Sequence, residues 1–281
     1  MDILAKHDSP RRSPAFAPRF RRLVVGAILA GGFAASCARL PAPGDMESLE
    51  TTANRTAERR ERSLVALESR MVVRLSGRAT GKLPAVDVQA KIASPDRARL
   101  QAHALLGLLL DAAVRNDTLL AWLPSERLGV RVPDLSDSLG VREPARFLGR
   151  ALAASWQAPH EAWRGATPDS QGVRLGWRDG DETWTLWVDR AGRPRQIQLE
   201  RDGRSLVVRY PQWRGAGDGA WPQRIELADG DGWVNARLDM EDTYHAKKSR
   251  PSWFAVSLPE DVTPLELEDL KRVIAKVRAA R

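Results

Sequence analysis

The chain has 281 residues, of which 43% are hydrophobic, and its formal net charge is +8. Residues 1–36 carry six basic and two acidic side chains, so the remaining 245 residues have a formal charge of only +4. The high pI therefore gives no support to nucleic-acid binding. A chain of this length and apolar content suits one domain of moderate size that buries a core.

The N-terminal segment has the three-part layout of a secretory signal. Five arginines precede an apolar run from Leu23 to Phe33, and Ala34-Ala35-Ser36 follows it. The run has 11 residues and reaches only about half of a ~30 Å hydrocarbon core, so we do not expect a transmembrane helix. We expect residues 1–36 to be a signal peptide, and the pair Arg21-Arg22 leaves twin-arginine export open beside the general route.

The stretch FAASC, residues 33–37, resembles a bacterial lipobox. Cys37 is the only cysteine and cannot form an internal disulfide, whereas lipidation would consume its thiol. The resemblance implies that Cys37 carries acyl chains such as palmitate and begins the mature lipoprotein, and that Ala38 sorts it to the outer membrane. A chance cysteine after an ordinary signal, or a free buried thiol, is the alternative.

The next segments predict a spacer, a helix and a first group of strands. Residues 37–45 form a Pro-rich spacer, and the charged stretch from Met46 to about Ser69 has helical spacing of its apolar residues. Strands are predicted in RMVVRLSGRA, AVDVQAKIA and ARLQAHALLG, and then in LLLDAAVRNDTLLAWLPSERLGVRV, where RNDT and PSER indicate turns. A helix is expected at residues 143–154.

A second group of strands is predicted from about Val173 to Met240. Hairpin signals stand at Asp179-Gly180, Ala191-Gly192 and Asp202-Gly203, and another turn is expected near residues 229–232. The short spacing between turns indicates an antiparallel meander. A C-terminal helix is expected after a possible N-cap at Thr263. A long antiparallel sheet with helices against one face is the simplest architecture that buries these elements.

No pattern of catalytic residues is found. The histidines are scattered, none stands at metal-ligand spacing, and no nucleophile elbow, P-loop or dinucleotide fingerprint occurs. We therefore expect no enzyme activity, no metal and no cofactor, unless His103, His160 or His245 converge with a carboxylate in a cleft. The stretch ALLGLLL, residues 104–110, is unusual because leucines at a hairpin tip would be exposed, which often marks a membrane or partner contact.

The order of these segments resembles the LolA/LolB lipoprotein-carrier superfamily, most closely LolB, a lipid-anchored outer-membrane receptor. The resemblance covers about residues 46–245 and rests on these segments: RMVVRLSG, PDRARLQAHALLG, LLAWLPSERLGVRV, GRPRQIQLERDGRSLVVRY and WPQRIELADGDGWVNARLDM. It implies an α+β fold in which an incomplete antiparallel β-barrel, a curved half-barrel, is covered by two or three helices and encloses an apolar cavity.

The resemblance also implies a function. The cavity would receive acyl chains of lipoproteins or lipids at the periplasmic face of the outer membrane, from a soluble periplasmic LolA-like carrier and without a nucleotide. LolB proteins carry a functional leucine in a protruding Asn-Pro-Leu-Gly loop. Here Leu106, between Leu105 and Gly107, takes its place, although the Asn and Pro are absent. We expect a monomer with no nucleic-acid partner.

Alternation along the strands predicts which side chains face the cavity. The candidates are Val88, Ala90, Ile92, Leu100, Leu110 and Leu120. Residues 246–281 form an extension beyond the family pattern, with Lys247, Lys248 and Arg250 in a basic surface. The alternative function is a non-enzymatic envelope module of the same fold that binds another protein, peptidoglycan or a different lipid. A closed, packed barrel would favour that module, whereas an open cavity would favour acyl-chain reception.

Overall fold

The computed structural model describes residues 43–78, 81–93, 95–104, 107–232, 234–246 and 248–266. Residues 1–42, which include Cys37, lie outside the described part. The described residues belong to one compact unit, residues 38–281, to which the following description is confined. Within this part of the chain, no helix is both long and apolar enough to cross a membrane.

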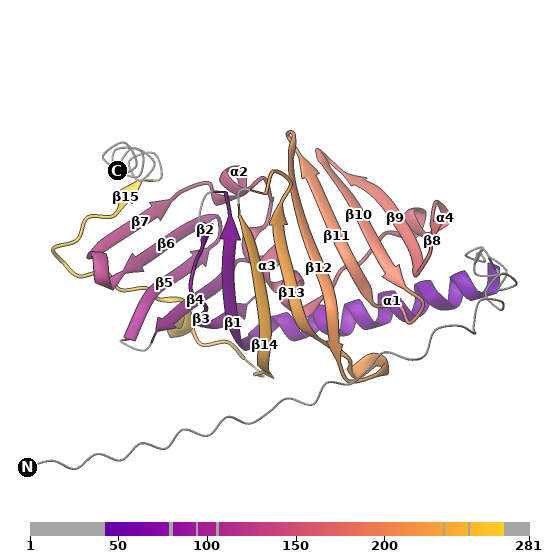
Figure 1. The fold of residues 1–281 in the computed structure, drawn as a ribbon, viewed down its shortest axis with the longest axis horizontal. Helices are drawn as coiled ribbons and strands as arrows, with labels where there is room; N and C mark the ends of the chain where they lie inside the picture. The colour runs from indigo at the N-terminus through magenta and orange to yellow at the C-terminus, as the bar shows by residue number, and fades with distance from the viewer. Residues whose placement is uncertain are drawn as a thin grey trace, which may run out of the picture. The chain divides into compact units, whose positions relative to one another are not determined.

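Two runs of strands follow one another along the chain, separated by short helices (Figure 1). The first run comprises β1 (Leu67–Gly77), β2 (Gly81–Lys82), β3 (Val86–Ala93), β4 (Arg97–Ala104), β5 (Gly107–Arg115), β6 (Thr118–Leu123) and β7 (Leu128–Val132). The second comprises β8 (Thr167–Asp169), β9 (Gly172–Asp179), β10 (Glu182–Asp189), β11 (Pro194–Arg201), β12 (Arg204–Arg214), β13 (Trp221–Asp229) and β14 (Asn235–His245). The other elements are α1 (Pro43–Ser63), η1 (Leu64–Ala66), η2 (Pro124–Glu126), α2 (Leu135–Leu139), α3 (Pro144–Ala153), α4 (His160–Arg164), η3 (Gly217–Gly219), η4 (Pro251–Phe254) and β15 (Leu265–Glu266).

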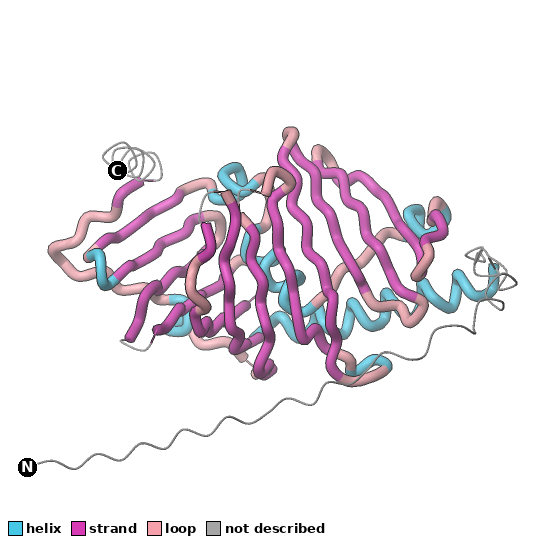
Figure 2. The backbone as a smooth tube through the Cα atoms, viewed as in Figure 1, coloured by secondary structure: helices cyan, strands magenta, loops and turns pink. Residues whose placement is uncertain are grey.

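All these strands join in one sheet. The order is β15-β7-β6-β5-β4-β3-β1-β14-β13-β12-β11-β10-β9-β8, with β2 beside β1. Every pair is antiparallel except β15 with β7, and the two meanders meet where β1 pairs with β14. The sheet curves without closing, with helices on one side (Figure 2). The predicted half-barrel covered by helices is therefore confirmed.

The hairpins of the second meander follow their turn residues. Asp202 and Gly203 join β11 to β12, and both have positive φ, at 51° and 73°. A type I′ two-residue turn, whose twist matches its strands, needs positive φ at both positions, and Asp-Gly is among the pairs that tolerate this. At the signal Asp179-Gly180, Asp179 ends β9 and Gly180, with a φ of 62°, begins the turn to β10, so this predicted turn is also found.

Helices α1 and α3 cover part of the concave face. The predicted helix at residues 143–154 is α3, which contacts β3, β4, β5 and β13. Gly149 lies where α3 approaches the sheet, since a Cβ there would stand 3.0 Å from Ile92 Cγ2. The predicted bounds of the first helix are wrong at both ends, because α1 begins at Pro43, inside the expected spacer, and ends at Ser63.

A buried arginine ties α1 to two distant loops. Arg60 is 3% exposed and donates to the carbonyl oxygens of Ala154, at 3.2 Å, and Ala220, at 2.6 Å. Its guanidinium lies 4.9 Å from the ring centre of Trp213. Nearby, Trp156 Nε1 donates to the hydroxyl of Tyr210 at 2.6 Å, and that hydroxyl donates to the carbonyl oxygen of Ala151. These bonds fix the helical cover on the second meander.

The residues after β14 belong to the packed structure. Phe254 of η4 is buried, and the Cβ position of Gly129 in β7 is within 3.3 Å of Leu258, Val262 and Pro264. The N-cap expected at Thr263 is wrong, because Leu265 and Glu266 form β15 beside β7 instead of a first helical turn. The rest of the expected C-terminal helix, residues 267–281, lies outside the described residues.

We predict that Arg60→Ala lowers the free energy of unfolding by about 3 kcal/mol, because it leaves two buried carbonyl oxygens without this donor. Arg59→Ala is the matched control, since Arg59 is its exposed neighbour on α1 and should change stability by about 0.5 kcal/mol or less. Urea denaturation followed by tryptophan fluorescence measures both. Equal losses in the two variants would contradict this role of Arg60.

Candidate functional site

Apolar side chains run in rows across the concave face of the first meander. Strand register places Ala90, Leu100, Ala112, Ala121 and Val130 in one row across five strands. A second row contains Ile92, Ala98, Val114, Leu119 and Val132, and a third contains Val88, Ala102 and Leu110. The inner surface is therefore apolar from β3 to β7.

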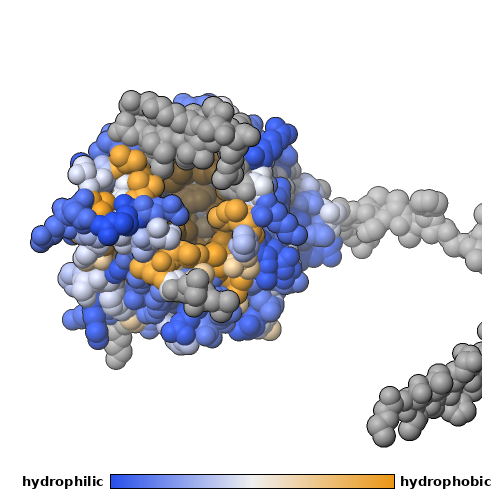
Figure 3. All heavy atoms as spheres, turned by 60° about the vertical axis from the view of Figure 1, so that its left-hand side comes forward, coloured by the Kyte–Doolittle hydropathy of each residue, from blue (hydrophilic) through white to orange (hydrophobic). Residues whose placement is uncertain are grey.

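Many members of these rows are alanines. Ala90, Ala98, Ala102, Ala112 and Ala121 share this face, and each is at most 8% exposed. A methyl group reaches only a short way from the sheet, so a curved sheet lined with alanines leaves space above it. Figure 3, which brings the β5–β7 side of the sheet forward, shows a hollow there with hydrophobic residues around its mouth.

A small cluster of hydrophobic side chains lies beneath the hollow. Ala112, Ala121, Val130, Val132 and Leu135 form a buried group separate from the main core. Four leucines that pack against the group are only half-buried: Leu110, Leu119, Leu123 and Leu128. A stable packed core would cover such side chains completely. We therefore take this concave surface of β5, β6 and β7, which we call the apolar hollow, as the candidate site.

The structure brings most of the predicted cavity residues together. Val88, Ala90, Ile92, Leu100 and Leu110 share the concave face, and the first four pack in or against the main core. Leu110 alone of the six predicted residues belongs to the hollow. Leu119, Leu123 and Leu128 were not predicted from the sequence. Leu119 and Leu123 each stand two residues from Ala121, and Leu128 lies opposite Leu123 across the PSER turn, so alternation could have indicated all three.

The prediction for Leu120 is wrong. Leu120 pairs with Ala113 on β5 and with Arg131 on β7, which places it on the convex face, opposite its neighbours Leu119 and Ala121. Residues 119–123 read LLAWL, so both faces of β6 are largely apolar and alternation does not separate them.

The C-terminal extension covers part of the convex face of the first meander. Arg99 on β4 and Asp111 on β5 form a two-pronged ion pair, at 2.7 and 2.6 Å, and Arg99 also donates to the carbonyl oxygen of Trp253 at 3.2 Å. Arg97 lies 5.5 Å from the ring centre of Phe254. The first meander is thus covered on its convex face by η4 and the segment after it, while its concave face holds the hollow.

Gly107 is the only described residue of the predicted tip. It begins β5, pairs with Ala104 and has a φ of 123°, a value that suits glycine. Leu105 and Leu106 lie outside the described residues, so their role remains a prediction.

The histidines occupy separate places. His160 on α4 lies 2.8 Å from the carboxylate of Glu50. His103 on β4 shares a recess with Asp87 and Glu241, and His245 on β14 shares another with Glu241 and Asp242. Burial lowers the pKa of His245, which lies against the edge of the Trp221 ring. Among the described residues, no group of three or more His, Cys, Asp or Glu is placed to hold a metal ion.

No family model matches the sequence, and comparison with curated proteins finds no match. Among solved structures, the chain is similar to a LolA superfamily protein from Nitrosomonas europaea, with 16% identity, a TM-score of 0.47, and coverage of 73% of this chain and 98% of that one. It is also similar to a putative outer membrane lipoprotein-sorting protein domain from Vibrio parahaemolyticus, with 11% identity, a TM-score of 0.44, and coverage of 73% and 97%. A protein of the DUF1329 family from Desulfovibrio piger shows 10% identity, a TM-score of 0.45, and coverage of 74% and 98%.

These identities and TM-scores are low. We therefore infer function from the geometry of the chain itself.

We predict that Ile92→Ala lowers the free energy of unfolding more than Leu110→Ala does, although both remove apolar groups from the concave face. Ile92 is 0% exposed beneath α3, so its loss should cost about 3 kcal/mol. Leu110 lies in the hollow with less packing around it, and its loss should cost about 1 kcal/mol. Urea denaturation of both variants measures the difference, and equal costs would contradict an open hollow.

Proposed function

We propose that the apolar hollow holds acyl chains of lipoproteins or lipids, so that the protein acts as a receptor or carrier of lipid in the bacterial envelope. The observation that carries this proposal is the half-buried leucine cluster on a concave face lined with alanines. Exposed apolar surface lowers stability and solubility, and it is retained where a ligand covers it. The side chains of the described cluster are aliphatic, which matches alkyl chains.

The energetics of acyl chains favour such a protein. Each methylene group removed from water contributes about 0.8 kcal/mol, so acylated molecules do not cross an aqueous compartment without cover. Exchange between two apolar cavities changes the burial of a chain little and needs no nucleotide. A soluble LolA-like carrier as donor fits this scheme, and we propose that the protein works as a monomer without a cofactor or enzyme activity.

We further propose that Cys37 is acylated and holds the protein at the periplasmic face of the outer membrane. The lipobox-like FAASC stretch and the alanine at position 38 support this placement. Leu105 and Leu106, which precede β5 in the sequence, and Gly107, which begins it, are proposed to guide chains between the membrane and the hollow.

Acyl-chain binding is tested with two half-buried leucines that lie on opposite faces of the sheet. Leu110 of β5 faces the hollow, whereas register places Leu120 of β6 on the convex face. In an exported Cys37→Ala background, Leu110→Glu should weaken binding of a fluorescent fatty acid by about tenfold or more, because it places a carboxylate beside the buried chain. Leu120→Glu should change the affinity by less than about twofold.

Circular dichroism and thermal unfolding of both variants verify that they fold. If native protein bound no fatty acid, or Leu110→Glu bound as well as Leu120→Glu, acyl-chain reception by the hollow would be rejected. Binding of a protein partner without lipid would then favour the envelope interaction module.

The anchor makes a separate prediction. Intact mass spectrometry of membrane-extracted protein should find a chain that begins at acylated Cys37, and Cys37→Ala should release the protein from the membrane fraction. Ala38→Asp should move the acylated protein from the outer to the inner membrane, with Ala38→Ser as the control that stays. An unmodified Cys37 in membrane-extracted protein would disprove the anchor.

A further inference from the structure

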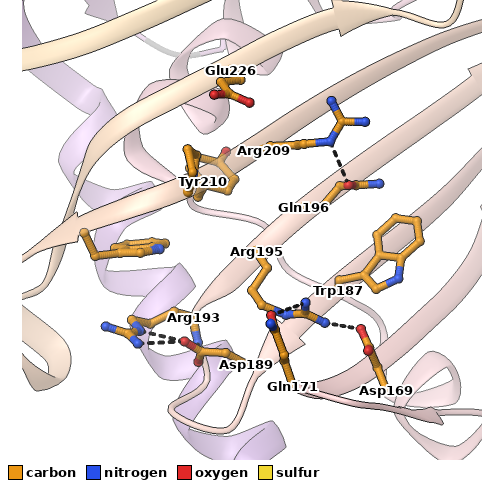
Figure 4. A pocket seen from close by; sticks show the side chains of 12 residues that line it. Asp169, Gln171, Trp187, Asp189, Arg193, Arg195, Gln196, Arg209, Tyr210 and Glu226 are labelled. Carbon is orange, nitrogen blue, oxygen red and sulfur yellow. Dashed lines mark hydrogen bonds and ion pairs between the residues drawn. The ribbon is translucent and has the colours of Figure 1, made fainter. Parts of the chain in front are cut away.

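A second recess lies on the other meander, away from the hollow. It has a volume of about 500 Å³ and is bordered by side chains of β8, β10, β11, β12 and β13 and of two turns (Figure 4). Its lining residues include Trp187, Gln196, Arg209, Tyr210, Trp213 and Glu226. This volume lies in the range of small-ligand sites, which combine aromatic surface with a few placed polar groups. We call it the Trp187 groove.

The groove contains an aromatic ring that has no aromatic or cation partner within the described part of the chain. Trp187 is half-buried on the convex side of β10, and no stacking or cation contact to its ring is found within the described part of the chain. By contrast, the ring of Trp213 has Arg60 at 4.9 Å and Arg193 at 5.7 Å from its centre. Trp187 is therefore the partly exposed ring of this groove whose faces carry no aromatic or cation contact.

Polar side chains extend from Trp187 in a straight row. Register places Trp187 opposite Gln196, Gln196 opposite Arg209, and Arg209 opposite Glu226, on four neighbouring strands. Gln196 Oε1 accepts a hydrogen bond from Arg209 Nε at 3.1 Å. Neighbouring strands lie about 4.8 Å apart, which is close to the length of one pyranose ring along a glycan. The row offers an apolar ring, an amide, a cation and a carboxylate in sequence.

The wall of the groove is already ordered. Arg195 contacts the carboxylate of Asp169 and donates to Gln171 Oε1 at 2.8 Å. Nε and Nη2 of Arg193 both lie 2.8 Å from Asp189 Oδ2. Groups held in place before a ligand arrives lose less entropy on binding.

The charges of the groove balance. Three arginines and three carboxylates line it: Arg193, Arg195, Arg209, Asp169, Asp189 and Glu226. A phosphate or another anion would therefore find no net attraction, and an apolar chain would leave these groups without partners. An uncharged ligand with many hydroxyl groups suits the groove, since each hydroxyl both donates and accepts hydrogen bonds.

We propose that the Trp187 groove binds pyranose rings of an uncharged glycan. The apolar C–H face of one ring lies on the Trp187 ring, whose electron-rich face attracts the C–H hydrogens. Hydroxyl groups of this ring and the next bond to Gln196, Arg209 and Glu226. The groove would thereby hold the domain against a polysaccharide while the hollow on the concave face stays accessible.

The test measures sugar binding by the anchor-free Cys37→Ala protein with two neutral probes, chitotetraose and maltotetraose, in saturation-transfer NMR and calorimetric titration. We expect at least one probe to bind with a Kd of about 0.1–1 mM. Trp187→Ala should weaken that binding by about tenfold or more, and Trp187→Phe should retain part of it. Trp122→Ala is the matched control, because Trp122 is a half-buried tryptophan on the convex face of β6.

Failure to bind either sugar at about 10 mM would overturn the proposal. Equal sugar affinity of Trp187→Ala and Trp122→Ala would also overturn it, as would displacement of the sugar by inorganic phosphate at equal concentration. Fatty-acid binding is measured on the same variants and should not change with Trp187→Ala. The proposal about the groove and the proposal about the hollow therefore fail or survive independently.

Discussion

The inner face of the curved sheet is largely apolar and has to be covered by other parts of the protein or by a ligand. In this protein the helices cover only part of it. Arg60, Trp156 and Tyr210 fix α1 and α3 over the second meander and its junction with β1 and β3. Beyond β4 the inner face carries alanines and half-buried leucines instead of a packed layer. The incomplete cover creates the hollow, and the proposed function depends on it.

The convex side shows how the protein tolerates an open inner face. Helix α3 supports β4 and β5 from within, and the chain after β14 returns to contact the same two strands through η4 and to pair β15 with β7. The Arg99–Asp111 ion pair joins two of these strands and binds the backbone at Trp253. This external layer holds the curvature of the sheet without filling the hollow, so stability and an open cavity are compatible.

Much of the fold follows from local sequence signals, and the failures have tertiary causes. Asp202-Gly203 fixes a hairpin through backbone φ alone, and the alternation of Val88, Ala90 and Ile92 places the concave face correctly. Leu120 was misplaced because both faces of β6 are largely apolar, so alternation does not distinguish them. The helix expected at Thr263 was wrong since Leu265 finds a partner strand at Val130, and strand pairing between distant residues has no local signal. The hollow itself depends on which face the helices leave uncovered, which no single segment specifies.

The most direct test of the account is photolabelling of the folded, anchor-free protein with a fatty acid that carries a diazirine near its methyl end, followed by identification of the labelled residues by mass spectrometry. The account predicts labels concentrated on Leu110, Leu119, Leu123 and Leu128, which excess unlabelled fatty acid suppresses. Labels confined to the convex face, or labels that competition does not reduce, would contradict the claim that the hollow is an acyl-chain site.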